Sequence, residues 1–142
     1  MRKVREWADA LGEAYDAHDA EVFVAGMRPD VEFIVPDAGA LKGREQVKQY
    51  VQGFFDAFPD ATLESVAKYE DGHTTIDEWI FRGTHTGPLA LPDGETLPPT
   101  QKRVSVPGID IETWDDDGMM IGDRAYFDQL EFLTQLGLMP AP

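Results

Sequence analysis

Residues 43–60 read GREQVKQYVQGFFDAFPD, and this stretch decides the fold class. Its apolar residues recur at intervals of three and four, which predicts an amphipathic helix with one apolar face. They are Val47, Tyr50, Val51, Phe54, Phe55 and Phe58. Gly43 precedes the helix, and Pro59-Asp60 ends it. A helix of this kind must lie on an apolar partner, and a curved sheet is the expected one.

The segment before this helix predicts two more helices and a short strand. Asp19 is a typical N-cap for the second helix, which Pro29-Asp30 ends. Val31–Val35 alternate as in a strand, and residues 36–39 read as a turn. The first helix shows its apolar face at Val4, Trp7, Ala8, Leu11, Ala14 and Tyr15.

The segment after the helix reads as four long strands. We expect them at residues 62–69, 73–86, 102–114 and 119–127. Asp71-Gly72 and Asp117-Gly118 are typical hairpin turns, and residues 87–100 form a loop rich in Pro and Gly. Pro107-Gly108 suggests a bulge or bend inside the third of these strands. Asp128 caps a short last helix that ends at Gly137.

This order of elements predicts the α+β class. Three N-terminal helices would pack on a strongly curved, mostly antiparallel sheet, in a cone-shaped α+β barrel with a short C-terminal helix. The chain has no internal repeat and no linker, so we expect one domain over residues 1–142. The open end of the cone is a natural pocket for a small molecule.

Composition excludes several classes of partner. The chain has 27 acidic and 12 basic side chains and a net charge of −15, which would repel nucleic acid and anionic membranes. It has no cysteine, so disulfides and thiolate metal sites are excluded. No signal peptide or membrane span is expected, and we expect a cytoplasmic protein.

Several short stretches resemble the SnoaL-like polyketide cyclases of the nuclear transport factor 2-like superfamily. They are Phe58-Pro59-Asp60, Gly83-Thr84-His85-Thr86-Gly87, Pro98-Pro99-Thr100, Tyr126-Phe127-Asp128 and Gln135-Leu136-Gly137. The resemblance covers nearly the whole chain. It implies a homodimer through the open face of the sheet and an acid–base reaction without a cofactor, in which an acidic side chain moves protons and an apolar pocket stabilises an enolate. The superfamily also includes isomerases, dehydratases, epoxide hydrolases and binding modules.

The resemblance also assigns positions. The catalytic aspartate of the cyclases corresponds to Ala125, which puts the standard aldol cyclisation in doubt, and Asp123 faces the same side of the strand two residues earlier. The histidine of the cyclases and the oxyanion-hole aspartate of the ketosteroid isomerases both fall near Asp110. The base of those isomerases corresponds to Val35, and the nearest carboxyl is Asp37.

Asp110 and Asp123 are the first candidate catalytic residues. Asp110 lies between Ile109 and Ile111, where burial would keep it protonated and able to donate a hydrogen bond to a developing oxyanion. Alternatively, it satisfies backbone amides at the expected bulge. Asp123 lies on an apolar strand face, where it serves the reaction or forms a salt bridge with Arg103 or Arg124.

His85 and Asp37 are further candidates for moving a proton. His85 would act at the mouth of the pocket or hydrogen-bond the loop backbone, and Asp37 is a rim acid or a turn-forming residue. Aromatic side chains would form the pocket wall or the core, with the Tyr15 hydroxyl free to meet a substrate oxygen. These are Tyr15, Phe54, Phe58 and Trp79.

No metal site is expected, since the histidines are scattered and no carboxylate cluster is apparent in the sequence. The leading hypothesis is a cofactor-independent enzyme of secondary metabolism that cyclises, isomerises or hydrates a polyketide-like apolar molecule. Two alternatives remain open: an epoxide hydrolase or ether-ring-forming cyclase, which would need Asp37 beside Asp110, and a non-catalytic small-molecule-binding or dimerisation module.

Overall fold

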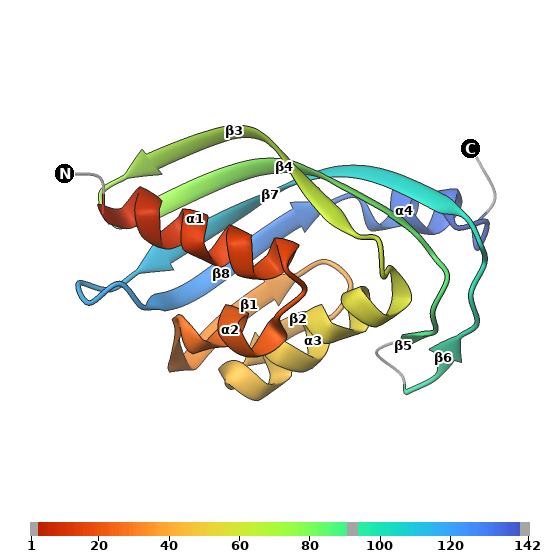
Figure 1. Ribbon diagram of the computed structural model, residues 1–142, viewed down its shortest axis with the longest axis horizontal. Helices are drawn as coiled ribbons and strands as arrows, with labels where there is room; N and C mark the ends of the chain where they lie inside the picture. Colours follow the sequence, from red (N-terminus) through yellow and green to blue (C-terminus); the bar gives the residue numbers. More distant parts are fainter. Residues whose placement is uncertain (1–2, 91–93, 140–142) are drawn as a thin grey trace.

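A computed structural model describes residues 3–90 and 94–139 of the chain (Figure 1). The described helices are α1 (Lys3–Asp16), α2 (Ala20–Ala25), α3 (Gly43–Ala57) and α4 (Gln129–Gln135). The described strands are β1 (Met27–Val35), β2 (Gly39–Lys42), β3 (Thr62–Asp71), β4 (Thr74–Thr84), β5 (Leu89–Ala90), β6 (Thr96–Leu97), β7 (Arg103–Trp114) and β8 (Met120–Phe127).

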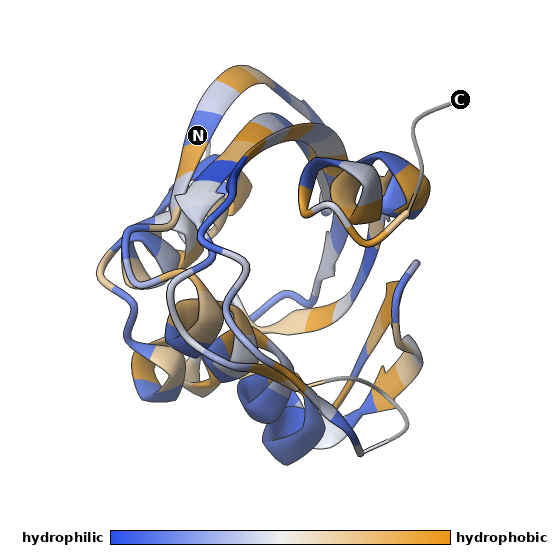
Figure 2. Cartoon of the chain, turned by 90° about the vertical axis from the view of Figure 1, so that its right-hand side faces the viewer, coloured by the Kyte–Doolittle hydropathy of each residue, from blue (hydrophilic) through white to orange (hydrophobic). Residues whose placement is uncertain are grey.

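Six of these strands form one curved sheet in the order β2-β1-β8-β7-β4-β3. All neighbours in it are antiparallel except β1 and β8, which run parallel. The sheet arches over α1, α2 and α3, and α4 lies at its far end beside β7 (Figures 1 and 2). The predicted α+β cone is therefore confirmed. The sheet is not a closed barrel, since β2 and β3 remain as its two edges.

The core has two parts, one at each end of the sheet. The first joins α1, α2 and α3 to β1 and β8, and Val31, Val47 and Met120 in it are fully buried. The second joins the end of α3 to β4, β7 and α4 around Phe58. Side chains of both parts border the cavity described below.

Several helix and strand ends follow from local sequence signals. The Asp19 carboxylate accepts from the Val22 N–H at 3.1 Å, and the Asp128 carboxylate accepts from the Glu131 N–H at 3.0 Å, so both predicted N-caps are confirmed. Both hairpins also form as predicted, with Gly72 and Gly118 at positive φ.

Other boundaries were wrong. β1 begins at Met27, so Pro29-Asp30 lie inside a strand instead of ending a helix. Proline is tolerated there because β1 pairs with β8 only at Met27 and then from Glu32 onward. The short edge strand β2 and the small β5–β6 pair inside the predicted loop were both missed, because four- and two-residue strands carry little periodicity.

The predicted bulge at Pro107-Gly108 is absent from the β4–β7 pairing, which keeps its register through both residues. A register shift instead lies in the β7–β8 pairing, where Trp114 pairs with Met120 but Thr113 pairs with Gly122. The extra residue, Ile121, is exposed, and the shift places Met120 and Asp123 on the same buried side of the sheet. Within the described residues, no helix is long and apolar enough to span a membrane.

Candidate active site

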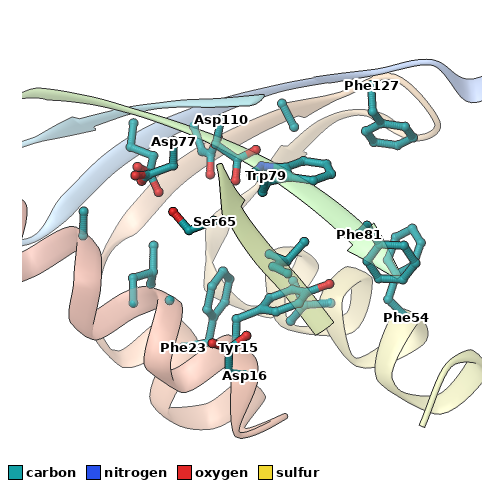
Figure 3. Close-up of a pocket in the computed structure, with 18 of the residues that line it drawn as sticks. Tyr15, Asp16, Phe23, Phe54, Ser65, Asp77, Trp79, Phe81, Asp110 and Phe127 are labelled. Carbon is teal, nitrogen blue, oxygen red and sulfur yellow. The ribbon is translucent and has the colours of Figure 1, made fainter. Parts of the chain in front are cut away.

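A cavity of about 390 Å³ lies between the concave face of the sheet and the helices α1 and α3. Figure 3 shows Asp77, Asp110 and Trp79 beneath the sheet, with Tyr15 and Phe23 on the helical side and Phe54, Phe81 and Phe127 toward one end. Its aromatic lining consists of Tyr15, Phe23, Phe33, Tyr50, Phe54, Trp79, Phe81, Phe127 and Phe132. A hollow of this size that combines aromatic and aliphatic side chains with convergent polar ones is typical of a small-molecule site.

Strand register gathers four carboxyls on one patch of the cavity wall. Asp110 and Glu112 are two residues apart on β7, so they face the same side of the sheet. Asp77 on β4 pairs with Asp110, and Asp123 on β8 pairs with Glu112. Carboxylate oxygens of Asp110, Glu112 and Asp123 all lie within 4.8 Å of one another. We call Asp77, Asp110, Glu112 and Asp123 the acidic cluster.

Two members of the acidic cluster have strong partners. The Arg5 guanidinium donates to the Asp77 carboxylate at 2.7 Å and to the Tyr69 carbonyl at 2.8 Å. The Thr75 hydroxyl donates to Glu112 at 2.7 Å and accepts from the Trp114 indole N–H at 2.9 Å. These bonds hold Asp77 and Glu112 in place.

The other two members are left largely without partners. Asp123 is 5% exposed, and its Oδ1 atom has no hydrogen-bond partner in the described part of the chain. The Trp79 indole N–H lies close enough to Asp110 to favour its ionised form, yet it completes no hydrogen bond of good geometry with any described residue. Asp110 and Asp123 both line the cavity, so a bound molecule can reach them.

Burial raises the pKa of three members of the acidic cluster. Desolvation, and then the charge of Asp77, raise the pKa of Asp110 to about 7. Desolvation and the charge of Asp110 raise the pKa of Asp123 well above its usual range. The pKa of Glu112 is raised mainly by burial and then by its contact with Asp77. These carboxyls titrate as a coupled group, so near neutral pH they share protons among them.

The two cavity tyrosines differ in their partners. The Tyr15 hydroxyl has no hydrogen-bond partner among the described residues, and burial followed by the charge of Asp110 raises its pKa. It therefore remains in its neutral donor form and is free to meet a ligand oxygen. The Tyr50 hydroxyl donates to Asp37 at 2.8 Å, and burial is the main cause of its raised pKa.

Asp37 lies on the far side of Tyr50 from the acidic cluster. It borders a second cavity of about 270 Å³, and Tyr50 and Phe54 line both cavities. Burial raises the pKa of Asp37, while the Tyr50 hydrogen bond opposes that rise. The structure therefore does not bring Asp37 beside Asp110.

His85 and Phe58 also lie outside the main cavity. His85 is fully buried, and its Nδ1 atom accepts from the Thr100 N–H at 3.1 Å and lies 3.0 Å from the Thr100 hydroxyl oxygen. Its ring therefore ties the two ends of the segment from β4 to β7 together. Phe58 is fully buried in the second part of the core, between Phe81 and His85.

The remaining predicted pocket residues, Tyr15, Phe54 and Trp79, line the cavity. Sequence reasoning missed Asp77, Glu112 and Arg5. The expectation of no carboxylate cluster was wrong, because strand pairing joins Asp77 to Asp110, 33 positions apart, and Glu112 to Asp123, 11 positions apart. The Asp110-Ile111-Glu112 alternation was the one local signal that could have indicated it. Asp123 forms no salt bridge with Arg103 or Arg124, although the Arg124 charge partly lowers its pKa.

Comparison with known proteins identifies the family. Residues 4–121 match the model of the SnoaL-like domain, and the chain belongs to that family. A comparison with curated protein sequences found no significant match.

Solved structures with this fold cover nearly the whole chain. A candidate SnoaL-like polyketide cyclase from Jannaschia sp. CCS1 has a TM-score of 0.84 at 23% identity, over 97% of this chain and 94% of that one. AclR from Streptomyces galilaeus, a candidate hydroxylase, has a TM-score of 0.80 at 20% identity, over 100% of this chain and 85% of that one. A candidate polyketide cyclase from Xanthomonas campestris pv. campestris has a TM-score of 0.80 at 19% identity, over 95% and 97%. At these identities the similarity establishes the shared fold.

Proposed function

We propose that this chain is a cofactor-independent acid–base enzyme that enolises a carbonyl group in a bulky, mostly apolar small molecule, as a SnoaL-like cyclase or isomerase does. The observation that carries the proposal is Asp110, an aspartic acid with a pKa of about 7 that faces an aromatic-lined cavity. A carboxyl of this kind is half protonated near neutral pH, where proton transfer in either direction is easiest.

The proposed step uses two members of the acidic cluster. An ionised Asp123 takes a proton from the carbon next to the carbonyl, and the C–H electron pair becomes the C=C bond of an enol. The carbonyl π electrons move to the oxygen, which receives a proton or hydrogen bond from Asp110. The Tyr15 hydroxyl, which has no partner in the described structure, is a second donor for that oxygen.

The alternatives have less support. An epoxide-opening reaction needs Asp37 beside Asp110, but Asp37 is bonded to Tyr50 and borders the second cavity. A non-catalytic module predicts a filled pocket or one without desolvated carboxyls, whereas this cavity is hollow and burial raises the pKa of three of its carboxyls. Ala125 lines the cavity, and Asp123 on the same strand is the nearest carboxyl to that position in the sequence.

The test is hydrogen–deuterium exchange at the α-carbons of 2-tetralone, an apolar bicyclic ketone, followed by NMR in D₂O. We expect the wild-type protein to accelerate exchange, and Asp110→Asn and Asp123→Asn each to lose about 100-fold of that acceleration. The matched control is Asp56→Asn, which removes an exposed charge on α3 that borders neither cavity. Folded Asp110 and Asp123 variants with wild-type exchange rates would rule the proposal out.

A further inference from the structure

The lining of the main cavity is strongly acidic and has almost no free positive charge. Among the described residues that line it, eight are acidic and one, Lys68, is basic. Lys68 is already paired with Asp9 at 2.8 Å, and Arg5, behind the wall, is paired with Asp77. An anionic ligand would be repelled here, and a cationic one attracted.

One carboxyl oxygen in this cavity wall has no hydrogen-bond partner among the described residues. Asp123 Oδ1 is buried without a hydrogen bond, although its side chain borders the cavity. One carboxylate oxygen each of Asp123, Asp110 and Glu112 lies within 4.8 Å of the other two. A buried carboxylate without a donor is costly, so a ligand that supplies a donor or a positive charge at this point gains that energy.

We propose that the substrate carries a positively charged nitrogen, a protonated or quaternary amine, that binds beside Asp123. This inference rests on the proposed function, because it names the substrate class for the same cavity. An organic cation fits better than a metal ion alone, since the cavity of about 390 Å³ has nine aromatic side chains in its lining and is far larger than an ion requires. The indole of Trp79 next to Asp110 (Figure 3) adds a ring face of the kind that favours ammonium groups.

A cationic substrate would also prepare the site for the proposed reaction. In the free protein the neighbouring charges and burial favour the protonated form of Asp123. An ammonium beside Asp123 would favour its ionised form, which a base must have. Asp110 and Glu112 belong to the same group of carboxyls, so the protons that remain on the group are shared among them, and Asp110 serves as the donor when it holds one.

The test compares two probes of the same shape, (3-hydroxyphenyl)trimethylammonium and the neutral 3-tert-butylphenol, by isothermal titration calorimetry. At pH 8 we expect the wild-type protein to bind the ammonium at least about 10-fold more tightly than the phenol. Asp123→Asn should weaken ammonium binding about 10-fold and leave phenol binding unchanged. Asp56→Asn, which removes one exposed charge, should change neither.

If Asp123→Asn does not fold, the pH dependence of probe binding by the wild-type protein tests the inference instead. The charged groups that act on Asp123 are Asp77 on β4, Asp110 and Glu112 on β7, and Arg124 on β8 itself. As pH rises from 6 to 8 the acidic cluster loses protons, so the preference for the ammonium over the phenol should increase in the wild-type protein. A preference that is absent or constant with pH overturns the inference.

Two further outcomes separate this inference from its alternatives. Tight Mn²⁺ binding that depends on Asp123 and displaces the ammonium would identify a metal site and overturn it. Loss of 2-tetralone exchange in Asp110→Asn without any ammonium preference would leave the proposed function standing and reject the amine. An ammonium preference that depends on Asp123, with exchange unaffected by either variant, would support the amine and reject the enolisation.

Discussion

A β-carbon on residue 108 would lie 2.4 Å from Cη2 of Trp79, so the indole occupies the space that only a glycine leaves free. Gly108 and Trp79 are paired residues on β7 and β4, and Trp79 lines the cavity next to Asp110. The small residue in one strand therefore positions the large side chain of the next strand against the candidate acid.

Gly108→Ala should displace the Trp79 indole and destabilise the fold. Side chains approach no closer than van der Waals contact, so the ring must shift, and overpacking of this kind costs about 1–3 kcal/mol. Urea unfolding with tryptophan fluorescence measures both effects. Gly53→Ala is the control, since its β-carbon meets nothing within 4 Å and alanine stabilises a helix interior by about 0.5–1 kcal/mol. Equal stability of Gly108→Ala and wild type would contradict the packing argument.

Arg5 should be the most important cation for stability. Its guanidinium is buried and paired with Asp77, so Arg5→Gln leaves without a counter-charge a carboxyl that acts on Asp110, Glu112 and Asp123. Loss of one partner of a buried pair costs about 3–5 kcal/mol, and we expect a large fall in the free energy of unfolding. Lys68→Gln breaks the exposed pair with Asp9 and should cost less than about 1 kcal/mol. If the two variants lose the same stability, Arg5 does not hold the acidic cluster.

The sequence predicted the helices and long strands but not the acidic cluster. Helix periodicity, turn glycines and the caps Asp19 and Asp128 are local signals, and they were correct. The cluster arises from the pairing of β4, β7 and β8, and register between distant strands is not written in any one segment. The register shift at Ile121 shows the limit, since simple alternation puts Ile121 and Asp123 on one face.

The same reason explains which candidate residues the sequence located in the site and which it did not. Asp110 and Asp123 were found because a carboxyl on an apolar strand is unusual in any register. For His85 and Phe58 the structure bears out the structural alternatives, a hydrogen bond to the loop backbone and a place in the core, and not the places in the pocket. Sequence could not decide between them, because it shows that a residue is next to a loop or on a helix face but not which side chains cover it. In the structure the Thr100 N–H donates to His85, and Phe81 packs against Phe58.

The acidic cluster should make stability fall as pH rises. The pKa of Asp110 is about 7 in the folded protein and near 3.9 in an unfolded chain, so the folded state binds the proton more tightly. The stabilisation from this proton is fully present below about pH 4 and is lost as pH rises through 7. Above that pH the free energy of unfolding no longer changes because of Asp110. Asp110→Asn removes this contribution. The free energy of unfolding of the variant, relative to that of wild type, should therefore rise by on the order of 3 kcal/mol between pH 4 and pH 8.

The measurement is urea unfolding of both proteins at several pH values between 4 and 8. The pKa values of Glu112 and Asp123 are also raised, so these residues too make the free energy of unfolding fall as pH rises. Both proteins should show this part of the pH dependence, and only wild type should show the part that comes from Asp110. A difference between the two proteins that does not change with pH would mean that Asp110 has an ordinary pKa. In that case enolisation should also show no loss of rate above pH 7.

His85 should matter for stability and not for proton transfer. His85→Ala removes the acceptor of the partly buried Thr100 N–H, which costs about 1–3 kcal/mol. Burial lowers the pKa of His85, so the wild-type histidine contributes most above its usual pKa of about 6.5, and the contribution is lost as pH falls toward the folded value. The stability difference between His85→Ala and wild type should therefore shrink below pH 6.5, opposite in direction to the effect of Asp110.

Unfolding curves and 2-tetralone exchange, measured on the same samples, separate the two roles. His73→Ala is the matched control, because His73 is exposed and contacts Asp116 and the ring of Trp7, away from the cavity lining. We expect His85→Ala to unfold at lower urea concentration and to exchange at nearly the wild-type rate while folded, since His85 does not border the cavity. A large loss of exchange with unchanged stability would instead make His85 a participant in the reaction, and would require the β4–β7 segment to open so that its ring reaches the substrate.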